Sequence, residues 1–234
     1  MLILISDAFD PSLPGQLAAF GEVTDDKERM SLHRKTVGGS GDGEILAEFA
    51  VETWPVSWHP SGEVLLVGQE DPQNSDLPNL LSLSLAEPGD PQPWQATSFV
   101  EYDASFSPDG RWVAYGSDES GEFEIYVAPF PGPGRKWQVS VGNGGWPVWR
   151  GDGSEILYVD ITGRMMAVSV EERGNGLTFG QPEALFQFRA AATDSGYAVT
   201  ADGERFLVIE PAENLPPEPV TVVVNWPAAI EAQR

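Results

Sequence analysis

A short turn that ends in glycine recurs four times along the chain, and its even spacing constrains the fold. The four glycines are separated by 48, 43 and 50 residues; they are Gly62, Gly110, Gly153 and Gly203. A large apolar residue lies four positions before each glycine. An apolar triplet begins three positions after each glycine, at 65–67, 113–115, 156–158 and 206–208. A repeat of about 40–50 residues that is built from short strands is typical of a propeller blade.

The residues of this turn have the properties that a tight connection between two strands needs. Glycine tolerates the positive φ of such a turn, and a short polar residue before it hydrogen-bonds to the backbone. In three of the four copies that polar residue is aspartate. We therefore interpret seven residues as turn formers that set the geometry of each blade, and not as an active site: Gly62, Asp109, Gly110, Asp152, Gly153, Asp202 and Gly203.

The segments between the turns predict an all-β propeller of four-stranded antiparallel blades. Some of them alternate with period two, as in 79–85, where leucine alternates with serine, and others are continuous apolar runs. We expect a single propeller over 1–234, with units at about 1–50, 51–98, 99–142, 143–190 and 191–230. About four units are regular. The first is degenerate because it lacks a glycine turn in register, and the last has a third strand at 220–226 but no fourth.

The formal net charge of −23 limits the partners of this chain. Nucleic-acid backbones and anionic membranes are bound through Lys and Arg, so we expect neither as a partner. No apolar run approaches the roughly 20 residues of a transmembrane helix, so no direct membrane insertion is expected. The apolar start at 1–5 meets Asp7 without a basic region, which predicts a strand and not a signal peptide. We interpret the acidity as a self-repelling surface, with a basic partner or a loosely held divalent cation as alternatives.

The residue types that carry catalysis or metal binding are scarce. There is no cysteine, which excludes disulfides and thiolate chemistry but leaves the compartment open. His33 and His59 are the only histidines, and Gly39-Ser40-Gly41 does not match the Gly-x-Ser-x-Gly elbow of a serine hydrolase. We expect no catalytic residue, no metal and no cofactor, and we interpret His59 as a variable turn residue.

Several aspartates lie in or beside loops, where calcium sites are often built. None belongs to the spaced acidic loop with a closing glutamate that binds calcium, so turn formation accounts for them better. They are Asp71, Asp76, Asp103, Asp109, Asp118 and Asp152.

Several segments resemble the TolB-type, WD-like propeller repeat. They include Ser-Pro-Asp-Gly-Arg-Trp-Val-Ala-Tyr at 107–115, Ser-Asp-Glu-Ser-Gly at 117–121 and Ile-Tyr-Val at 125–127. Others resemble this repeat as it occurs in the C-terminal propeller behind the kinase domain of many bacterial membrane-anchored serine/threonine kinases: 129–131, 134–140, 147–149, 164–168, 202–208 and 220–226. The resemblance covers about 45–230 and implies a sensing or scaffolding module of about six blades. Because fewer units are present and no kinase motif is found, we expect an open or incomplete ring, or the tail of a longer protein.

Two functions follow from the resemblance. The first is a non-catalytic sensory propeller that binds a protein or ligand, extracytoplasmic if it follows a membrane-anchored kinase. The second is the gating or scaffolding propeller of a TolB-like or prolyl-oligopeptidase-like assembly whose catalytic domain this chain lacks. In both we expect a protein or peptide partner at the loops that enter the inner strands, at Trp54, Glu101, Tyr102 and Trp146 and at 194–196. Exposed edges of the first and last units predict pairing with a second copy.

Overall fold

The computed structural model describes residues 2–3, 17–23, 30–36, 43–86, 89–132, 134–174, 176–189 and 196–210, and every regular element among them is a β-strand. These strands form antiparallel sheets that follow one another along the chain, and we number the sheets blades 1 to 5. Blade 1 contains β1 (Leu2–Ile3), β2 (Leu17–Val23), β3 (Met30–Thr36) and β4 (Glu44–Phe49). Blade 2 contains β5 (Thr53–Trp58), β6 (Val64–Asp71), β7 (Asn74–Ser84) and β8 (Gln92–Gln95).

The later blades keep the same order of strands. Blade 3 contains β9 (Glu101–Phe106), β10 (Trp112–Ser117), β11 (Glu124–Pro129) and β12 (Trp137–Gln138). Blade 4 contains β13 (Gly144–Trp149), β14 (Glu155–Asp160), β15 (Arg164–Arg173), β16 (Gly176–Phe179) and β17 (Glu183–Gln187). In the described part of the chain, blade 5 contains β18 (Tyr197–Val199) and β19 (Phe206–Val208).

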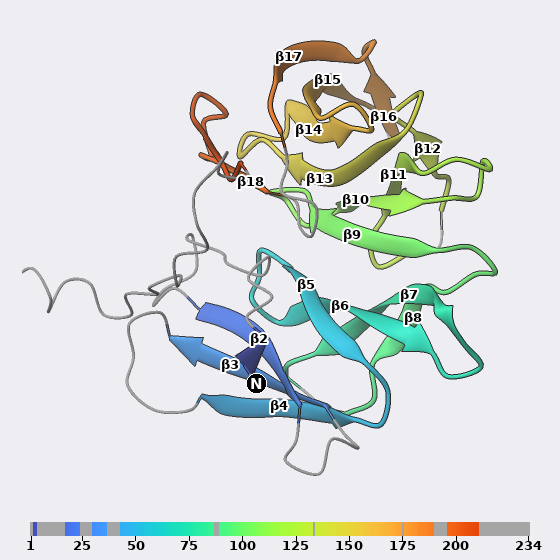
Figure 1. Cartoon of the computed structure of the whole chain (residues 1–234), viewed down its shortest axis with the longest axis vertical. Coiled ribbons are helices and arrows are strands. Elements are labelled where there is room, and N and C mark those ends of the chain that lie inside the picture. Colours follow the sequence, from blue (N-terminus) through green and yellow to red (C-terminus); the bar gives the residue numbers. More distant parts are fainter. Residues whose placement is uncertain are drawn as a thin grey trace, which may run out of the picture.

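The blades follow one another around an arc (Figure 1). The first strands of blades 2, 3 and 4 are neighbours, because β5 contacts β9 and β9 contacts β13, and blade 1 contacts β5 through β2 and β3. Sheets that radiate from a common centre in this way define a β-propeller. The predicted fold class, an all-β propeller of four-stranded antiparallel blades, is therefore confirmed, and the described blades form an open arc.

Three details differ from the sequence prediction or extend it. Blade 1, which the sequence predicts to be degenerate because it lacks the glycine turn in register, nevertheless has four strands, in the order β1-β2-β3-β4. The sequence did not predict β16, which forms because Gly174, with φ +62°, lets the chain reverse after β15 and pair with it again. The predicted strand at 220–226 lies outside the described residues, and the unit boundaries stay a prediction.

The apolar triplets lie in the second strands of blades 2 to 5, and neighbouring residues of a triplet face opposite blades. In blade 2 the middle residue, Leu66, packs in a cluster with Val113 of blade 3. The flanking residue Leu65 packs instead in a cluster with Leu32 of blade 1. Because both faces of the strand are covered, the triplet residues of blades 2, 3 and 4 are at most 2% exposed. Full burial of one such side chain stabilises the fold by about 1.5–3 kcal/mol.

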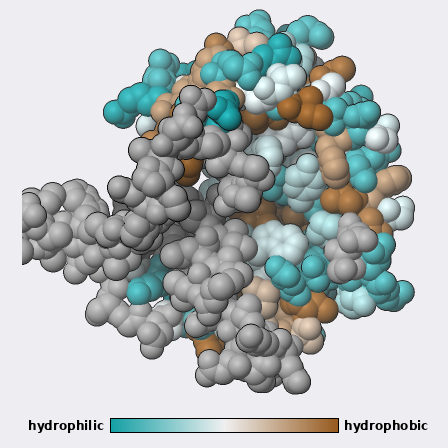
Figure 2. All heavy atoms as spheres, in the orientation of Figure 1, coloured by the Kyte–Doolittle hydropathy of each residue, from teal (hydrophilic) through white to brown (hydrophobic). Residues whose placement is uncertain are grey.

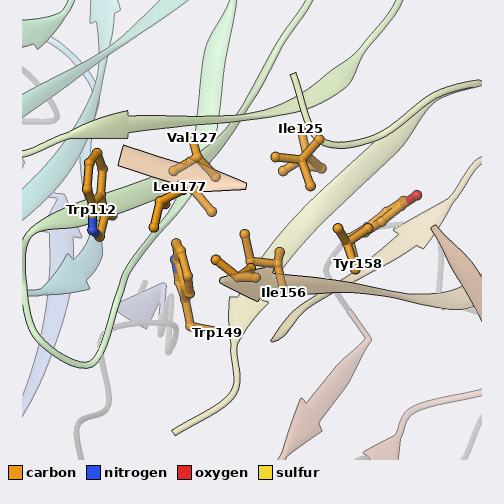
Figure 3. Close-up of a cluster of buried hydrophobic side chains, with 11 residues drawn as sticks. Trp112, Ile125, Val127, Trp149, Ile156, Tyr158 and Leu177 are labelled. Carbon is orange, nitrogen blue, oxygen red and sulfur yellow. The ribbon is translucent and has the colours of Figure 1, made fainter. Parts of the chain in front are cut away.

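The contact between blades 3 and 4 shows how these faces meet (Figure 3). Ala114, the middle residue of the blade 3 triplet, is buried in the same cluster as the flanking residues Ile156 and Tyr158 of blade 4. Trp112 of blade 3 and Trp149 of blade 4 belong to this cluster too. Each blade thus supplies half of an apolar core that is completed only by its neighbour.

The repeated turns have nearly identical geometry. Each of their four glycines has φ between +71° and +75°, and its N–H donates to the carbonyl three residues earlier at 2.8 to 2.9 Å. Each aspartate accepts a hydrogen bond from the N–H two residues later: Arg111 donates to Asp109, Ser154 to Asp152 and Glu204 to Asp202. The hydroxyls of Ser154 and Thr200, together with these N–H groups, lower the pKa of Asp152 and Asp202. At pH values above the usual carboxyl pKa, both ionised carboxylates therefore stabilise the folded state. This stabilisation is lost as the pH falls through their lowered pKa.

Successive turns also pack against one another in the space that the glycines leave. A Cβ on Gly110 would overlap the imidazole of His59, which belongs to the turn of blade 2. A Cβ on Gly203 would lie 3.2 Å from the side chain of Arg150, in the turn of blade 4. The His59 ring also lies edge-on to Phe106 of blade 3, with ring centroids 5.0 Å apart. His59 is thus not simply a variable turn residue, because it packs between two blades.

We expect Gly110→Ala to lower the free energy of unfolding by about 1–3 kcal/mol, because alanine is strained at positive φ and its Cβ collides with His59. Part of this loss should return in a His59→Ala background, where the collision is removed. Chemical denaturation of the wild type, the two single variants and the double variant measures both effects. An equal loss in both backgrounds would show that the two turns do not depend on each other.

Candidate functional site

Antiparallel pairing brings several loops to one end of blades 3 and 4. The loops that precede β9 and β13 lie at this end, and so do the β10–β11 and β14–β15 hairpins. The repeated glycine turns lie at the opposite end of the strands. We call the surface formed by the first group the loop face, and it consists of residues 97–100, 118–123, 141–143 and 160–163.

Hydrogen bonds hold the segments of the loop face together. The N–H of Val100 donates to Asp118 at 2.9 Å, that of Gly144 to the carbonyl of Phe123 at 2.9 Å, and that of Gly142 to the buried carboxylate of Glu124 at 2.8 Å. The Asn143 side chain adds a bond of 2.7 Å to Glu122. The first bond joins two loops of blade 3, and the other three join its β10–β11 hairpin to the loop that enters blade 4, so these three segments have a defined arrangement without a partner. The fourth segment, 160–163, is held by its own turn, in which the N–H of Gly163 donates to the carbonyl of Asp160 at 2.9 Å.

Large apolar side chains are exposed in each of the four segments. The exposed fractions are 39% for Phe99, 39% for Phe123, 79% for Val141 and 75% for Ile161. The ring of Tyr102 lies edge-on to Phe123, with centroids 5.2 Å apart, and extends the apolar area toward the inner strand β9. Figure 2 shows hydrophobic residues reaching the surface between hydrophilic ones. Exposed apolar groups that lie together within a polar rim mark interaction sites.

The sequence did not single out these four residues. The available signal was an apolar residue inside an otherwise polar turn, as for Phe123 between Glu122 and Glu124. A residue that packs locally gives the same signal. Only the order of the strands brings the four segments to one surface.

Two of the predicted site residues, Trp54 and Tyr102, occupy equivalent positions in β5 and β9. Each ring lies over a glycine of the neighbouring strand, Gly68 in β6 and Gly116 in β10. Both side chains are half-buried. The rings therefore pack within their own blades and keep a part that a partner can reach.

The third predicted aromatic residue, Trp146, lies in β13 with φ +54°. Asp103 in β9 has φ +51°, and the two are equivalent because each lies three residues before the last residue of its strand. Positive φ at a non-glycine residue costs about 1–3 kcal/mol, and such residues cluster at functional sites. The carbonyl of Trp146 accepts a hydrogen bond from the hydroxyl of Tyr197 in blade 5. Strained inner strands thus lie beneath the loop face.

The fourth predicted residue, Glu101, is only 1% exposed. Burial raises the pKa of Glu101, although hydrogen bonds from the hydroxyl and N–H of Thr97 act in the opposite direction. The carboxylate thus anchors the loop at 97–100 from within. A binding role for Trp54, Glu101, Tyr102 and Trp146 stays a prediction, and the loop at 194–196 lies outside the described residues except for Gly196.

Glu101→Gln tests this account through its pH dependence. Because the pKa of Glu101 is raised in the folded state, its ionisation disfavours folding, and stability returns as the pH falls toward the ordinary value of 4.5. We expect the variant to be at least as stable as the wild type at about pH 7 and to lose this gain on acidification. Urea denaturation across the pH range measures it, with the exposed Glu183→Gln as control. Parallel curves for Glu101→Gln and the wild type would contradict the account.

Carboxylates occur in the same segments as the apolar residues of the loop face. Glu122 is exposed beside Phe123, whereas Lys136 is paired with Glu119, and Arg164 with Asp160 at 2.7 Å. Because the charges of Lys136 and Arg164 are already paired, they do not neutralise the remaining carboxylates, and the surface stays acidic. Among the described residues, no group of three His, Asp or Glu side chains is arranged to hold a metal ion.

No protein-family model and no curated protein matches the chain. Solved structures match it in fold. TolB from Acinetobacter baumannii matches over 85% of this chain and 47% of its own, with a TM-score of 0.60 and 14% identity. A putative TolB from Agrobacterium tumefaciens matches over 70% of this chain and 60% of its own, with a TM-score of 0.55 and 14% identity. Oligogalacturonate lyase in complex with manganese matches over 82% of this chain and 58% of its own, with a TM-score of 0.56 and 13% identity.

At such low identities these matches concern the fold alone, which is a TolB-like β-propeller. The chain spans between about half and three-fifths of the length of the two TolB structures. In the part of the chain that the structure describes, no helix has the length and apolar character needed to cross a membrane.

Proposed function

We propose that the chain is a non-catalytic propeller module that binds a protein or peptide through its loop face. The observation that carries this proposal is the gathering of Phe99, Phe123, Val141 and Ile161 on loops that hydrogen bonds hold in place. A surface that is formed in advance binds with a smaller ordering cost than a flexible one. Tyr102 and Trp146, whose side chains are half-buried, lie near the start of β9 and β13, the strands that begin at this surface.

The negative charge of the loop face limits the kind of partner that it can bind. The loop face carries carboxylates such as Asp118 and Glu122, and the whole chain has a net charge of −23. Complementary charge speeds encounter and selects partners. We therefore expect an apolar segment flanked by Lys or Arg.

Two biological settings fit this function. The segments that resemble propellers of membrane-anchored serine/threonine kinases support a sensory module behind a kinase domain. The fold shared with TolB supports a scaffolding propeller as the second candidate. The coding sequence upstream distinguishes them: a kinase domain and a transmembrane helix would support the first, and a signal peptide with a globular domain the second.

A random peptide display library tests the binding function. We expect the wild type to enrich peptides that combine apolar residues with Lys or Arg. Ile161→Ser and Val141→Ser should each lower the affinity of an enriched peptide by about tenfold, which is about 1.4 kcal/mol. Both side chains are at least 75% exposed, so neither variant removes a core residue.

Leu185→Ser is the matched control, because Leu185 is an exposed apolar residue of β17, outside the loop face. It should leave peptide affinity unchanged. Absence of enrichment over the empty support would overturn the proposal. So would equal affinity of the wild type and both loop-face variants.

A further inference from the structure

The outer ends of two contacts between blades are built alike but covered differently. Trp94 in β8 and Trp137 in β12 each lie in the last strand of a blade and are followed by glutamine. Trp94 packs against the cluster that blades 2 and 3 share, and Trp137 against the cluster that blades 3 and 4 share. The two tryptophans therefore hold corresponding positions, and the surroundings of one indicate what fits beside the other.

A hairpin of blade 4 covers Trp137. The last four residues of β15 pair with β16, the strand that follows it. Phe179 of β16 lies near Trp137, with ring centroids 6.3 Å apart, and Gly176 is so close to the indole that a Cβ would be 3.3 Å from it. Leu177 is buried in the core between the two blades (Figure 3). An aromatic side chain of the protein itself thus fills the outer end of this contact.

In the described part of blade 3, no such hairpin covers Trp94. The corresponding strand, β11, has six residues where β15 has ten, and the described residues between β11 and β12 contain no further strand. A cleft of about 440 Å³ lies beside the half-buried Trp94, and its lining includes Pro93, Pro129, Pro131 and Lys136. Clefts that bind small ligands have volumes of about 300–1,000 Å³.

The lining of the cleft favours recognition through side chains. Pro129 and Pro131 have no N–H group, so neither can donate a hydrogen bond to an added strand. An aromatic ring that enters the cleft meets the indole of Trp94, and paired aromatic rings are stabilised beyond the burial of their surface. Among the nine described residues of the lining, Lys136 alone is charged, and its side chain is 39% exposed. The cleft therefore suits an aromatic ring with a carboxylate beside it.

The hairpin of blade 4 is attached to blade 3 by this same combination of groups. Besides the ring contact described above, Glu172 of β15 pairs with Arg111 of blade 3 through two hydrogen bonds of 2.7 Å. Arg111 is also paired with Asp109, just as Lys136 is paired with Glu119. A cation that already has one carboxylate partner thus accepts a second one in this protein.

We propose that the cleft beside Trp94 binds an aromatic side chain of a partner polypeptide that carries a carboxylate close to this ring. The ring lies against Trp94 as Phe179 lies against Trp137, and the carboxylate pairs with Lys136. None of the lining residues belongs to the loop face, so this site is separate from the one proposed above and does not depend on it. Its charge preference is also the opposite, because the loop face favours Lys or Arg.

The net charge of −23 opposes an acidic ligand at long range. Salt screens this repulsion, because the Debye length is about 8 Å at 0.15 M ionic strength, whereas the pair with Lys136 is a direct contact. Binding should therefore be measured at this ionic strength.

NMR spectra of the ¹⁵N-labelled protein test the proposal, with N-acetyl-Glu-Phe-amide as the probe. We expect the indole N–H signal of Trp94, identified by its loss in Trp94→Phe, to shift and saturate as the probe is added. N-acetyl-Glu-Ala-amide, which lacks the ring, should bind about tenfold more weakly. N-acetyl-Lys-Phe-amide, which reverses the charge, should bind about fivefold more weakly.

Lys136→Gln should weaken binding of the Glu-Phe probe by about two- to fivefold and leave binding of neutral N-acetyl-Gln-Phe-amide unchanged. Arg173→Gln is the matched control, because it removes an exposed cation outside the cleft, and it should bind like the wild type. Thermal unfolding checks that both variants keep the fold. A Trp94 signal that does not respond to the probe would contradict the proposal, as would equal affinities of the three charged probes or of the wild type and Lys136→Gln.

Discussion

Burial of an apolar triplet on both of its faces couples each blade to its two neighbours. A four-stranded sheet of this size cannot cover its own second strand, so its stability depends on the sheets beside it. Leu65 reaches the cluster shared with blade 1 while Leu66 reaches the cluster shared with blade 3. The packing of consecutive blades against one another, and with it the arc that they form, depends on this alternation.

The glycine turns extend this coupling from the strands to one end of the blades. Gly110 is needed for its positive φ, and its missing Cβ also leaves room for His59 of the preceding blade. One residue thus satisfies a local requirement of the turn and a packing requirement between blades. At the opposite end of the strands, the loop face carries the exposed residues Phe99, Phe123, Val141 and Ile161.

The candidate site was less predictable than the fold for a physical reason. Turns and strands are local, so the repeat and the alternation around 79–85 predicted the blades well. The loop face depends on hydrogen bonds between distant segments, such as the N–H of Val100 with Asp118. Likewise, the burial of Glu101 under its loop has no local signature.

The sequence by itself determined the turns, the second strands and the class of fold, because these depend on residues within a few positions of one another. Tertiary structure decided which side chains are covered. Leu66, Leu157 and Leu207 hold the same place in their repeats, yet their exposed fractions are 0%, 2% and 69%. A following blade covers the first two, whereas among the described residues no blade follows Leu207. The repeat predicts that a residue has to be covered, but only the packed arrangement of the blades decides whether another blade covers it.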